Sequence, residues 1–312
     1  MNFKQVIELV KETFSEWLED KASRLAAALA YYTVFSLAPL VIIVLGIAGL
    51  IFGEDVAGSY LLRQVESLVG QTGAEVFETI VEGAGQSSAT SLTATIIGIA
   101  TLIFGATGVF AQLQDALNTV WGVMPRPGRG IWHIIETRFA SLTMVLGIGF
   151  LLLVSLVISA VLAAFNDYVN SLLPGGHILA QIINIAVSFG VITLLFAMMF
   201  RYLPDVEIEW RDVWIGAAAT ALLFAIGKFA LGFYLGRQSF SSTYGAAGSI
   251  LIILLWVYYS AQILLLGAEF TQVYAKKFGS KSRPDEDAIP LTPEMRARQG
   301  IPRPETVKTN DI

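Results

Sequence analysis

The stretch GSILIILLWVYYSAQILLLGAEFTQVYA, residues 248–275, is long and apolar enough to cross a bilayer. The hydrocarbon core of a membrane is about 30 Å thick, so a spanning helix needs about 20 mostly apolar residues. Five further stretches meet this criterion, at residues 25–52, 91–113, 139–165, 180–202 and 213–236. The sequence therefore predicts an all-α, polytopic membrane bundle with six transmembrane helices, over residues 25–276.

Composition supports a membrane protein and excludes several other classes. Of the 312 residues, 55% are hydrophobic and 14% charged, whereas soluble domains carry about 25% charged residues. The net charge of −5 leaves no basic surface for nucleic acid. The absence of cysteine excludes disulfides, thiolate nucleophiles and zinc–thiolate sites. We therefore expect membrane lipids as partners, no nucleic acid and no cofactor.

The distribution of Lys and Arg predicts the orientation, because cytoplasmic connections are enriched in these residues. The termini and the even-numbered connections hold seventeen of them, against two, Arg63 and Arg237, in the odd-numbered connections. We expect a multi-pass protein of a bacterial inner membrane with both termini in the cytoplasm.

Three segments flank or connect the spans. Residues 1–24 have apolar side chains at helical spacing, which predicts an amphipathic helix against the bilayer or beneath the bundle. Residues 54–90 predict two short external helices over the mouth of the bundle, with a solvated acidic loop as the alternative. The proline-rich and charged tail, residues 277–312, predicts a disordered cytoplasmic extension.

Polar residues in the first two spans are candidate functional groups, because such residues are costly in lipid and usually face the bundle interior. Tyr32 and Ser36 lie one turn apart and Pro39 follows, so a kinked helix there would line a cavity. The alternative is that Ser36 bonds back to its own helix. Asp115 and Asn118 share a face at the cytoplasmic end of the second span, where solvation is the alternative.

The fifth span contains Lys228 on a face otherwise built of small residues, namely Ala221, Ala225, Gly232 and Gly236. Small residues let helices approach closely, so we expect Lys228 to point into the bundle. The alternative is that its ammonium reaches the outer interface.

The last span places Tyr259, Gln262, Leu266 and Glu269 on one face. A buried carboxylate at Glu269 needs a partner or a raised pKa. A structural ion pair, with Arg24, Arg138 or Arg201 ending near the same depth, is the alternative to a functional role.

Sequence motifs of common enzymes are missing. His133 and His177 fall on opposite sides of the membrane in the predicted topology, and the chain contains no HExxH, GxSxG or Walker sequence. We therefore expect no catalytic, cofactor or metal site and no enzymatic activity.

Several segments, in order over residues 15–275, resemble the YihY family, also called the virulence factor BrkB family. The matching pieces are Asp20, residues 27–31, 36–40, 116–121, Gly227-Lys228, Tyr244-Gly245, 255–258 and 266–271. The resemblance implies a six-helix inner-membrane protein. It also brings an older label of tRNA-processing ribonuclease, which the residues do not support, and links to serum resistance, envelope integrity and transport.

Two functions from different classes follow. The leading hypothesis is transport or handling of a lipid, envelope precursor or small solute, with an anionic lipid or solute as candidate ligand of Lys228. The alternative is a non-catalytic scaffold for envelope assembly. An aqueous cavity at Lys228 or Glu269 would favour transport, and a tight apolar bundle would favour the scaffold.

Overall fold

The computed structural model describes residues 2–53, 58–59, 61–63, 66, 74, 77–78, 108–127, 176–236, 246–280 and 282–302. Within these residues the chain is predominantly helical. The long helices are α1 (Phe3–Glu19), α2 (Ala22–Phe52), α7 (Gly176–Tyr202), α8 (Trp210–Gly236) and α10 (Ala246–Phe278). A further helical stretch covers residues 108–121.

Three helices in the described part of the chain are long and apolar enough to cross a membrane, over Ile185–Tyr202, Trp210–Leu231 and Leu251–Phe278. They confirm the helices predicted at 180–202, 213–236 and 248–275. The predicted first span coincides with α2, which has 31 residues and so also reaches the length that a span requires. The third predicted span, most of the second and most of residues 54–90 lie outside the described residues, so the number six stays a prediction.

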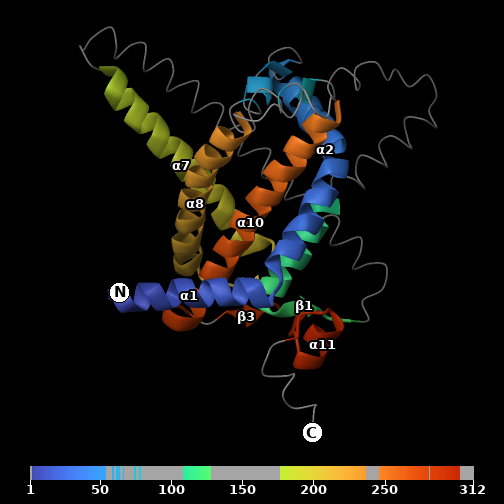
Figure 1. Cartoon of the computed structure of the whole chain (residues 1–312), viewed down its shortest axis with the longest axis vertical. Helices are drawn as coiled ribbons and strands as arrows, with labels where there is room; N and C mark the ends of the chain where they lie inside the picture. The colour runs from blue at the N-terminus through green and yellow to red at the C-terminus, as the bar shows by residue number, and fades with distance from the viewer. Residues whose placement is uncertain are drawn as a thin grey trace, which may run out of the picture.

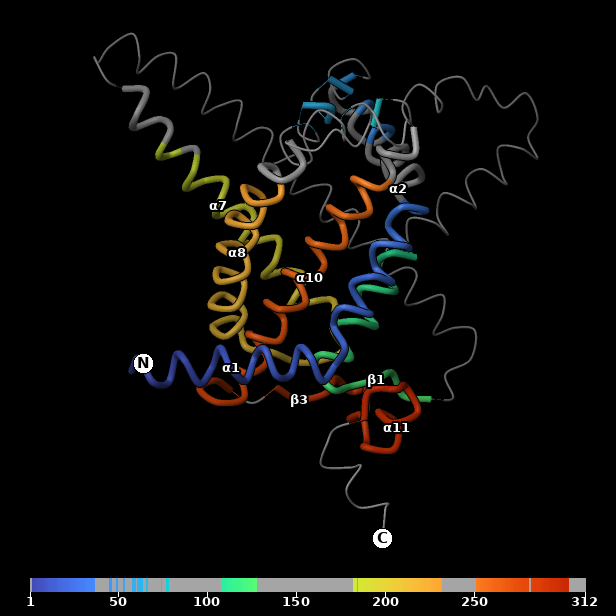
Figure 2. The backbone as a smooth tube through the Cα atoms, in the orientation of Figure 1, coloured from blue at the N-terminus to red at the C-terminus, as the bar shows by residue number. Residues whose placement is uncertain are grey.

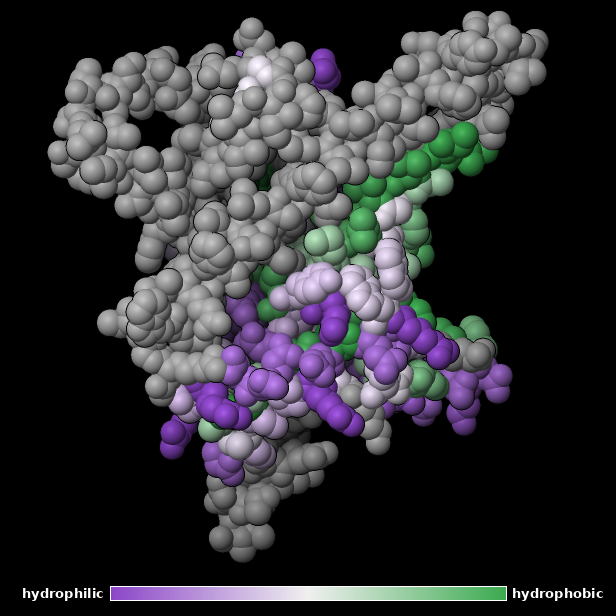
Figure 3. All heavy atoms as spheres, turned by 180° about the vertical axis from the view of Figure 1, so that it is seen from behind, coloured by the Kyte–Doolittle hydropathy of each residue, from purple (hydrophilic) through white to green (hydrophobic). Residues whose placement is uncertain are grey.

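The spanning helices form a bundle in which α10 is central. It packs against α2 on one side and α8 on the other, and α8 packs against α7, as Figure 1 shows. Helix α1 runs across the end of this bundle, and the tube in Figure 2 shows the described C-terminal residues gathered at the same end. Figure 3 shows hydrophilic residues concentrated at that end and hydrophobic residues above them.

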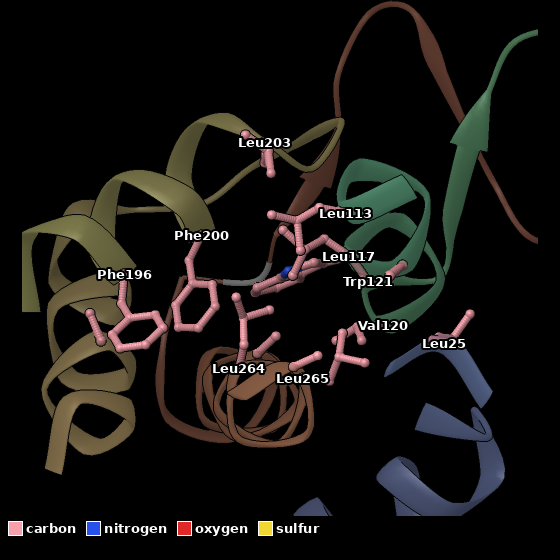
Figure 4. Close-up of a cluster of buried hydrophobic side chains, with 14 of the residues drawn as sticks. Leu25, Leu113, Leu117, Val120, Trp121, Phe196, Phe200, Leu203, Leu264 and Leu265 are labelled. Carbon is pink, nitrogen blue, oxygen red and sulfur yellow. The ribbon is translucent and has the colours of Figure 1, made fainter. Parts of the chain in front are cut away.

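A cluster of buried apolar side chains lies near this polar end, where four parts of the chain meet (Figure 4). The stretch 108–121 contributes Leu113, Leu117, Val120 and Trp121, and α7 contributes Phe196 and Phe200. Leu264 and Leu265 of α10 and Leu25 of α2 complete the contact. Because this cluster joins the helix ends, it fixes the positions of the polar groups around it.

The C-terminal segment differs from the sequence prediction, because residues 282–302 are folded onto the bundle. Strand β4 (Ala288–Pro290) pairs antiparallel with β1 (Val123–Pro125), and β3 (Arg283–Pro284) pairs antiparallel with β2 (Val206–Glu207). The short helix α11 (Pro293–Arg298) follows, with Thr292 as its N-cap. Backbone pairing and buried side chains from distant elements outweigh the polar composition, so disorder was the wrong prediction for 282–302. Residues 303–312 lie outside the described residues.

Candidate functional site

A stripe of polar side chains runs along α10 inside the apolar bundle. Glu269 is completely buried. Gln262 and Gln272 are half-buried, and the Oε1 atom of each meets no hydrogen-bond donor among the described residues. Gln262 and Glu269 are seven residues apart, so they lie two turns apart on one face. We call Gln262, Glu269 and Gln272 the polar stripe.

The polar stripe faces away from α8. Gly267 touches α8, because a Cβ atom at this position would lie 2.7 Å from Thr220 Cγ2. Glu269 follows two residues later, and such positions project about 200° apart on a helix. Since α2 packs on the other side of α10, the polar stripe lies on the α2 side of the bundle.

The opposite face of α10 forms a close seam with α8. Thr271 packs on Gly216, and Thr220 packs on Gly267. Each threonine hydroxyl donates to the carbonyl four residues earlier, Thr220 to Gly216 and Thr271 to Gly267, both at 2.7 Å. Two Gly-x-x-x-Thr segments therefore interlock in antiparallel directions, and their hydroxyls are satisfied within their own helices. We call these four residues the glycine–threonine seam.

Lys228 lies on α8 more than two turns beyond Thr220, outside the glycine–threonine seam. The neighbouring Gly227 is buried, and a Cβ atom there would lie 2.7 Å from Tyr259 Cε1. Lys228 itself is half-buried and forms no ion pair with another described residue. Of the small residues predicted to share its face, Ala221 is buried and Ala225 is half-buried, while the surroundings of Gly232 and Gly236 lie outside the described residues. The structure brings Tyr259 toward α8, and it separates Lys228 from the polar stripe.

The candidate functional residues on α2 lie in two environments, the bundle interior and the bundle surface. Ser36 is buried, and its hydroxyl donates to the carbonyl of Tyr32 at 2.8 Å. The alternative reading of Ser36, a bond within its own helix, is therefore the one observed. Tyr32 is exposed on the bundle surface. Helix α2 continues through Pro39, whose side chain lies outside the described residues, as does all of Tyr244.

Asp20 lies at the corner between α1 and α2 and pairs with Arg296 of α11. Both residues are buried, with 1% and 5% of their surfaces exposed. The corner residue Lys21 has a φ of 52°, in the left-handed region. Its ammonium donates to the carbonyl of Gly300 at 2.6 Å, and Arg24 donates to that of Gln299 at 3.1 Å. The C-terminal segment is thus fastened to the corner by one ion pair and two hydrogen bonds.

Asn118 and Gln114 hold an aspartate that the sequence reading missed. Asn118 Nδ2 donates to Asp205 Oδ2 at 2.8 Å, and its Oδ1 accepts from the Asp205 backbone N–H at 2.8 Å. Gln114 Nε2 donates to Asp205 Oδ1 at 2.9 Å. Asp115, the predicted companion of Asn118, is exposed instead. Asp205 follows Pro204 shortly after the end of α7 at Tyr202, and a Pro-Asp pair after an apolar helix is a turn signal that could have marked it.

Acidic side chains gather next to this aspartate. The N–H of Asp285 donates to the Asp205 carbonyl at 3.1 Å. Burial raises the pKa of the Asp285 carboxyl, the Asp205 and Glu207 carboxylates raise it further, and Arg201 opposes them. Within the described part of the chain, no set of three or more His, Asp or Glu side chains is arranged to hold a metal ion.

A second missed carboxylate fixes the start of α8 to the end of α10. Asp212 is buried, and its Oδ2 accepts from the backbone N–H and the hydroxyl of Ser280, both at 3.0 Å. The end of α10 is also tied to α1 by an ion pair between Lys277 and Glu12. These bonds join the helix ends at one side of the bundle into a connected base.

Comparison with known proteins agrees with this architecture. The family model described as "Virulence factor BrkB" matches residues 13–291. The chain belongs to the virulence factor BrkB family. The family assignment that the sequence segments suggested is therefore confirmed, and the matched range includes the polar stripe and the glycine–threonine seam.

Relatives of this BrkB-family chain carry the name UPF0761 membrane protein. One from Methylibium petroleiphilum is 28% identical over 285 residues, covering 85% of this chain and 65% of the relative. One from Stenotrophomonas maltophilia (strain K279a) is 31% identical over 265 residues, covering 83% of this chain and 59% of the relative. One from Pseudomonas aeruginosa (strain LESB58) is 27% identical over 282 residues, covering 86% of this chain and 62% of the relative.

This BrkB-family chain thus spans less than two thirds of the length of the relatives that it matches. No solved structure matches it. Together with its apolar helices, the comparison shows a membrane protein of this family.

Proposed function

We propose that this protein transports or handles a lipid, an envelope precursor or a small solute, as a six-span protein of a bacterial inner membrane with both termini in the cytoplasm. The observation that supports the proposal is the polar stripe on α10. The stripe lies within a bundle of helices whose other buried side chains are largely apolar.

The energetic argument begins with the two glutamines. A buried amide oxygen that loses its hydrogen bond costs roughly 1–3 kcal/mol. Neither Gln262 Oε1 nor Gln272 Oε1 has a donor among the described residues. Polar side chains in spanning helices usually face the bundle interior or a water-filled path. Water or a passing polar group on the α2 side of α10 would satisfy both amides, and this favours transport.

The ligand class follows from Lys228. Lys228 is half-buried in an apolar helix, where an anionic headgroup or solute would stabilise its ammonium. Lys228 and the polar stripe lie on different sides of α10, so the proposed anion and the polar path are separate features. We propose a binding role for Lys228 and a path-lining role for Gln262 and Glu269.

A scaffold without substrate is the second candidate, and the glycine–threonine seam favours it. Glycines at Gly216 and Gly267 let two helices approach at close range, which is how membrane helices gain packing energy. The bonds at the base also join the helix ends. A fixed bundle suits an assembly partner, whereas transport requires that some helix pair can open.

We propose that the activity is not enzymatic. The support comes from the sequence, which has no motif of a hydrolase, a zinc protease or a P-loop enzyme. Its acidic balance also fits poorly with an RNA-processing surface, which requires clustered Lys and Arg.

The transport proposal can be tested by measuring whether water reaches the polar stripe. The chain has no cysteine, so Gln262→Cys introduces a single thiol on the stripe. In the full chain reconstituted into liposomes, this thiol is expected to react with a small charged methanethiosulfonate, because the reagent needs a water path to reach it.

Ile263→Cys is the matched control, because Ile263 is 8% exposed and packs against Gly227 of α8, on the face of α10 turned away from the polar stripe. It is expected to stay unreactive under the same conditions. Equal protection of both thiols in a correctly folded sample would contradict the transport proposal and favour the scaffold.

Orientation has its own test. Glu78 and Arg126 are both exposed and lie in connections predicted on opposite sides of the membrane. In spheroplasts, Glu78→Cys is expected to react with an impermeant maleimide, and Arg126→Cys only after lysis, because Lys- and Arg-rich connections stay in the cytoplasm. The reverse pattern would show that the orientation is inverted.

A further inference from the structure

Helix α1 presents an apolar stripe that the described part of the protein leaves uncovered. The residues recur at spacings of four, three, four and four, so they lie along one side of the helix. Their exposed fractions are 81% for Phe3, 43% for Ile7, 56% for Val10, 52% for Phe14 and 56% for Leu18. We call these five residues the α1 apolar stripe.

The stripe is one of three distinct faces of α1. A second face meets the bundle through the buried residues Leu9 and Thr13 and the ion pair between Glu12 and Lys277. A third face is polar, with Lys4, Glu8, Lys11 and Ser15 exposed and Glu19 half-buried. At about 100° per residue, these faces lie roughly a third of a turn apart. A single helix thus contacts protein on one side and presents an apolar and a polar surface on the others.

The position of α1 matches the boundary between apolar core and water. Helices α8 and α10 run antiparallel, since Gly216 packs on Thr271 and Thr220 on Gly267. The start of α8 and the end of α10 therefore lie at one end of the bundle. The pair between Lys277 and Glu12 places α1 at that same end, transverse to the spanning helices (Figure 1).

Exposed aromatic residues mark this end as an interface. Tyr202 at the end of α7 and Trp210 and Trp214 at the start of α8 are 60%, 41% and 43% exposed. Their rings contact one another at 5.9 and 6.4 Å between centroids. Tyrosine and tryptophan are enriched where the hydrocarbon core meets the headgroups, so α1 lies at the depth of that boundary.

We propose that the α1 apolar stripe is a lipid-binding surface, inserted into the boundary between headgroups and acyl chains of the leaflet at this end of the bundle. An interfacial helix buries its apolar face about 5–10 Å into that boundary. The bundle-facing side fixes the rotation of α1, and this rotation turns the stripe toward lipid and the polar face toward water.

The binding is apolar rather than electrostatic. Helix α1 carries Lys4 and Lys11 against Glu8, Glu12, Glu16 and Glu19, so it has no basic surface that would attract anionic lipid. Zwitterionic lipid is therefore sufficient as the partner. This inference rests on the placement of α1 and does not depend on the transport proposal.

The test uses the full chain reconstituted in phosphatidylcholine, with a fluorescent probe on a single cysteine. Val10→Cys and Phe14→Cys place the probe on the stripe, and Lys11→Cys places it on the polar face of the same helix. Lipid with a nitroxide at the headgroup end of its acyl chain is expected to quench the two stripe probes several-fold more than the Lys11→Cys probe. Iodide in the water is expected to show the opposite preference.

A repeat in phosphatidylcholine with added phosphatidylglycerol is expected to leave this pattern unchanged. Equal quenching at Val10→Cys and Lys11→Cys by both quenchers would overturn the proposal. Protection of the stripe probes from both quenchers, with disulfide-linked dimers of Val10→Cys, would show instead that a second copy of the chain covers the stripe.

Discussion

Arg296→Ala is expected to destabilise the folded protein by about 3–5 kcal/mol, because removing one member of a buried ion pair is strongly destabilising. Asp20 is 1% exposed and Arg296 is 5% exposed, so the pair lies away from bulk water. The loss would appear as a large drop in the melting temperature of the detergent-solubilised protein.

The neighbouring Arg298 provides the matched control. It lies in the same short helix but is exposed, so Arg298→Ala is expected to change stability little. The double variant Asp20→Asn with Arg296→Met removes both charges and is expected to recover part of the loss, because replacing both members of a buried pair is often close to neutral. Equal melting temperatures for Arg296→Ala and Arg298→Ala would show that the pair is solvated.

This ion pair also explains why the fold of the C-terminal segment escaped sequence reasoning. Residues 282–302 have no apolar run of their own, and their prolines and charges are typical of disorder. Their order depends on partners far away in the chain, such as Asp20, which is 276 residues from Arg296. Helical periodicity reports only local structure, so it cannot show such contacts.

The spanning helices were more predictable, because lipid imposes length and apolar composition on each segment separately. The predicted helices at 180–202, 213–236 and 248–275 agree with α7, α8 and α10 to within a few residues. The amphipathic pattern of residues 1–24 likewise predicted α1.

The candidate site was only partly predictable, because the face of a helix that packs inward depends on the neighbouring helices. The burial of Glu269 could be expected from its position in an apolar run, and the structure shows it. Lys228 was expected on the packing face, but the contact is centred on Gly216 and Thr220 instead. Small residues occur around most of α8, so their spacing alone did not select the face that meets Thr271.

The glycine–threonine seam should tolerate no added methyl group. Gly216→Ala would place a Cβ atom 2.7 Å from Thr271 Cβ, and Gly267→Ala would place one 2.7 Å from Thr220 Cγ2. Both distances are far below van der Waals contact, and the threonines sit on helix backbone that cannot retreat without moving the whole helix. Each variant is expected to lose about 1–3 kcal/mol through overpacking, measured as a lower melting temperature in detergent.

Gly190→Ala separates this steric effect from the general effect of alanine in a helix. Gly190 lies on the exposed side of α7, where an added Cβ would meet nothing within 4 Å. Alanine has the better helix propensity, so this control is expected to keep or slightly raise the melting temperature. A loss as large as that of Gly216→Ala would mean that the seam is not the cause.

Exchanging the two sides of one contact provides the decisive comparison. Thr271→Gly removes the side chain that Gly216→Ala would strike. In the double variant, the methyl group added on α8 therefore enters the space left by Thr271 on α10. Glycine within α10 costs about 1 kcal/mol by itself, so Thr271→Gly alone is expected to be destabilising. If the two helices touch at this point, the double variant will nevertheless be more stable than Gly216→Ala alone. Additive losses in the double variant would contradict the contact, because residues that do not touch show little coupling in such a cycle.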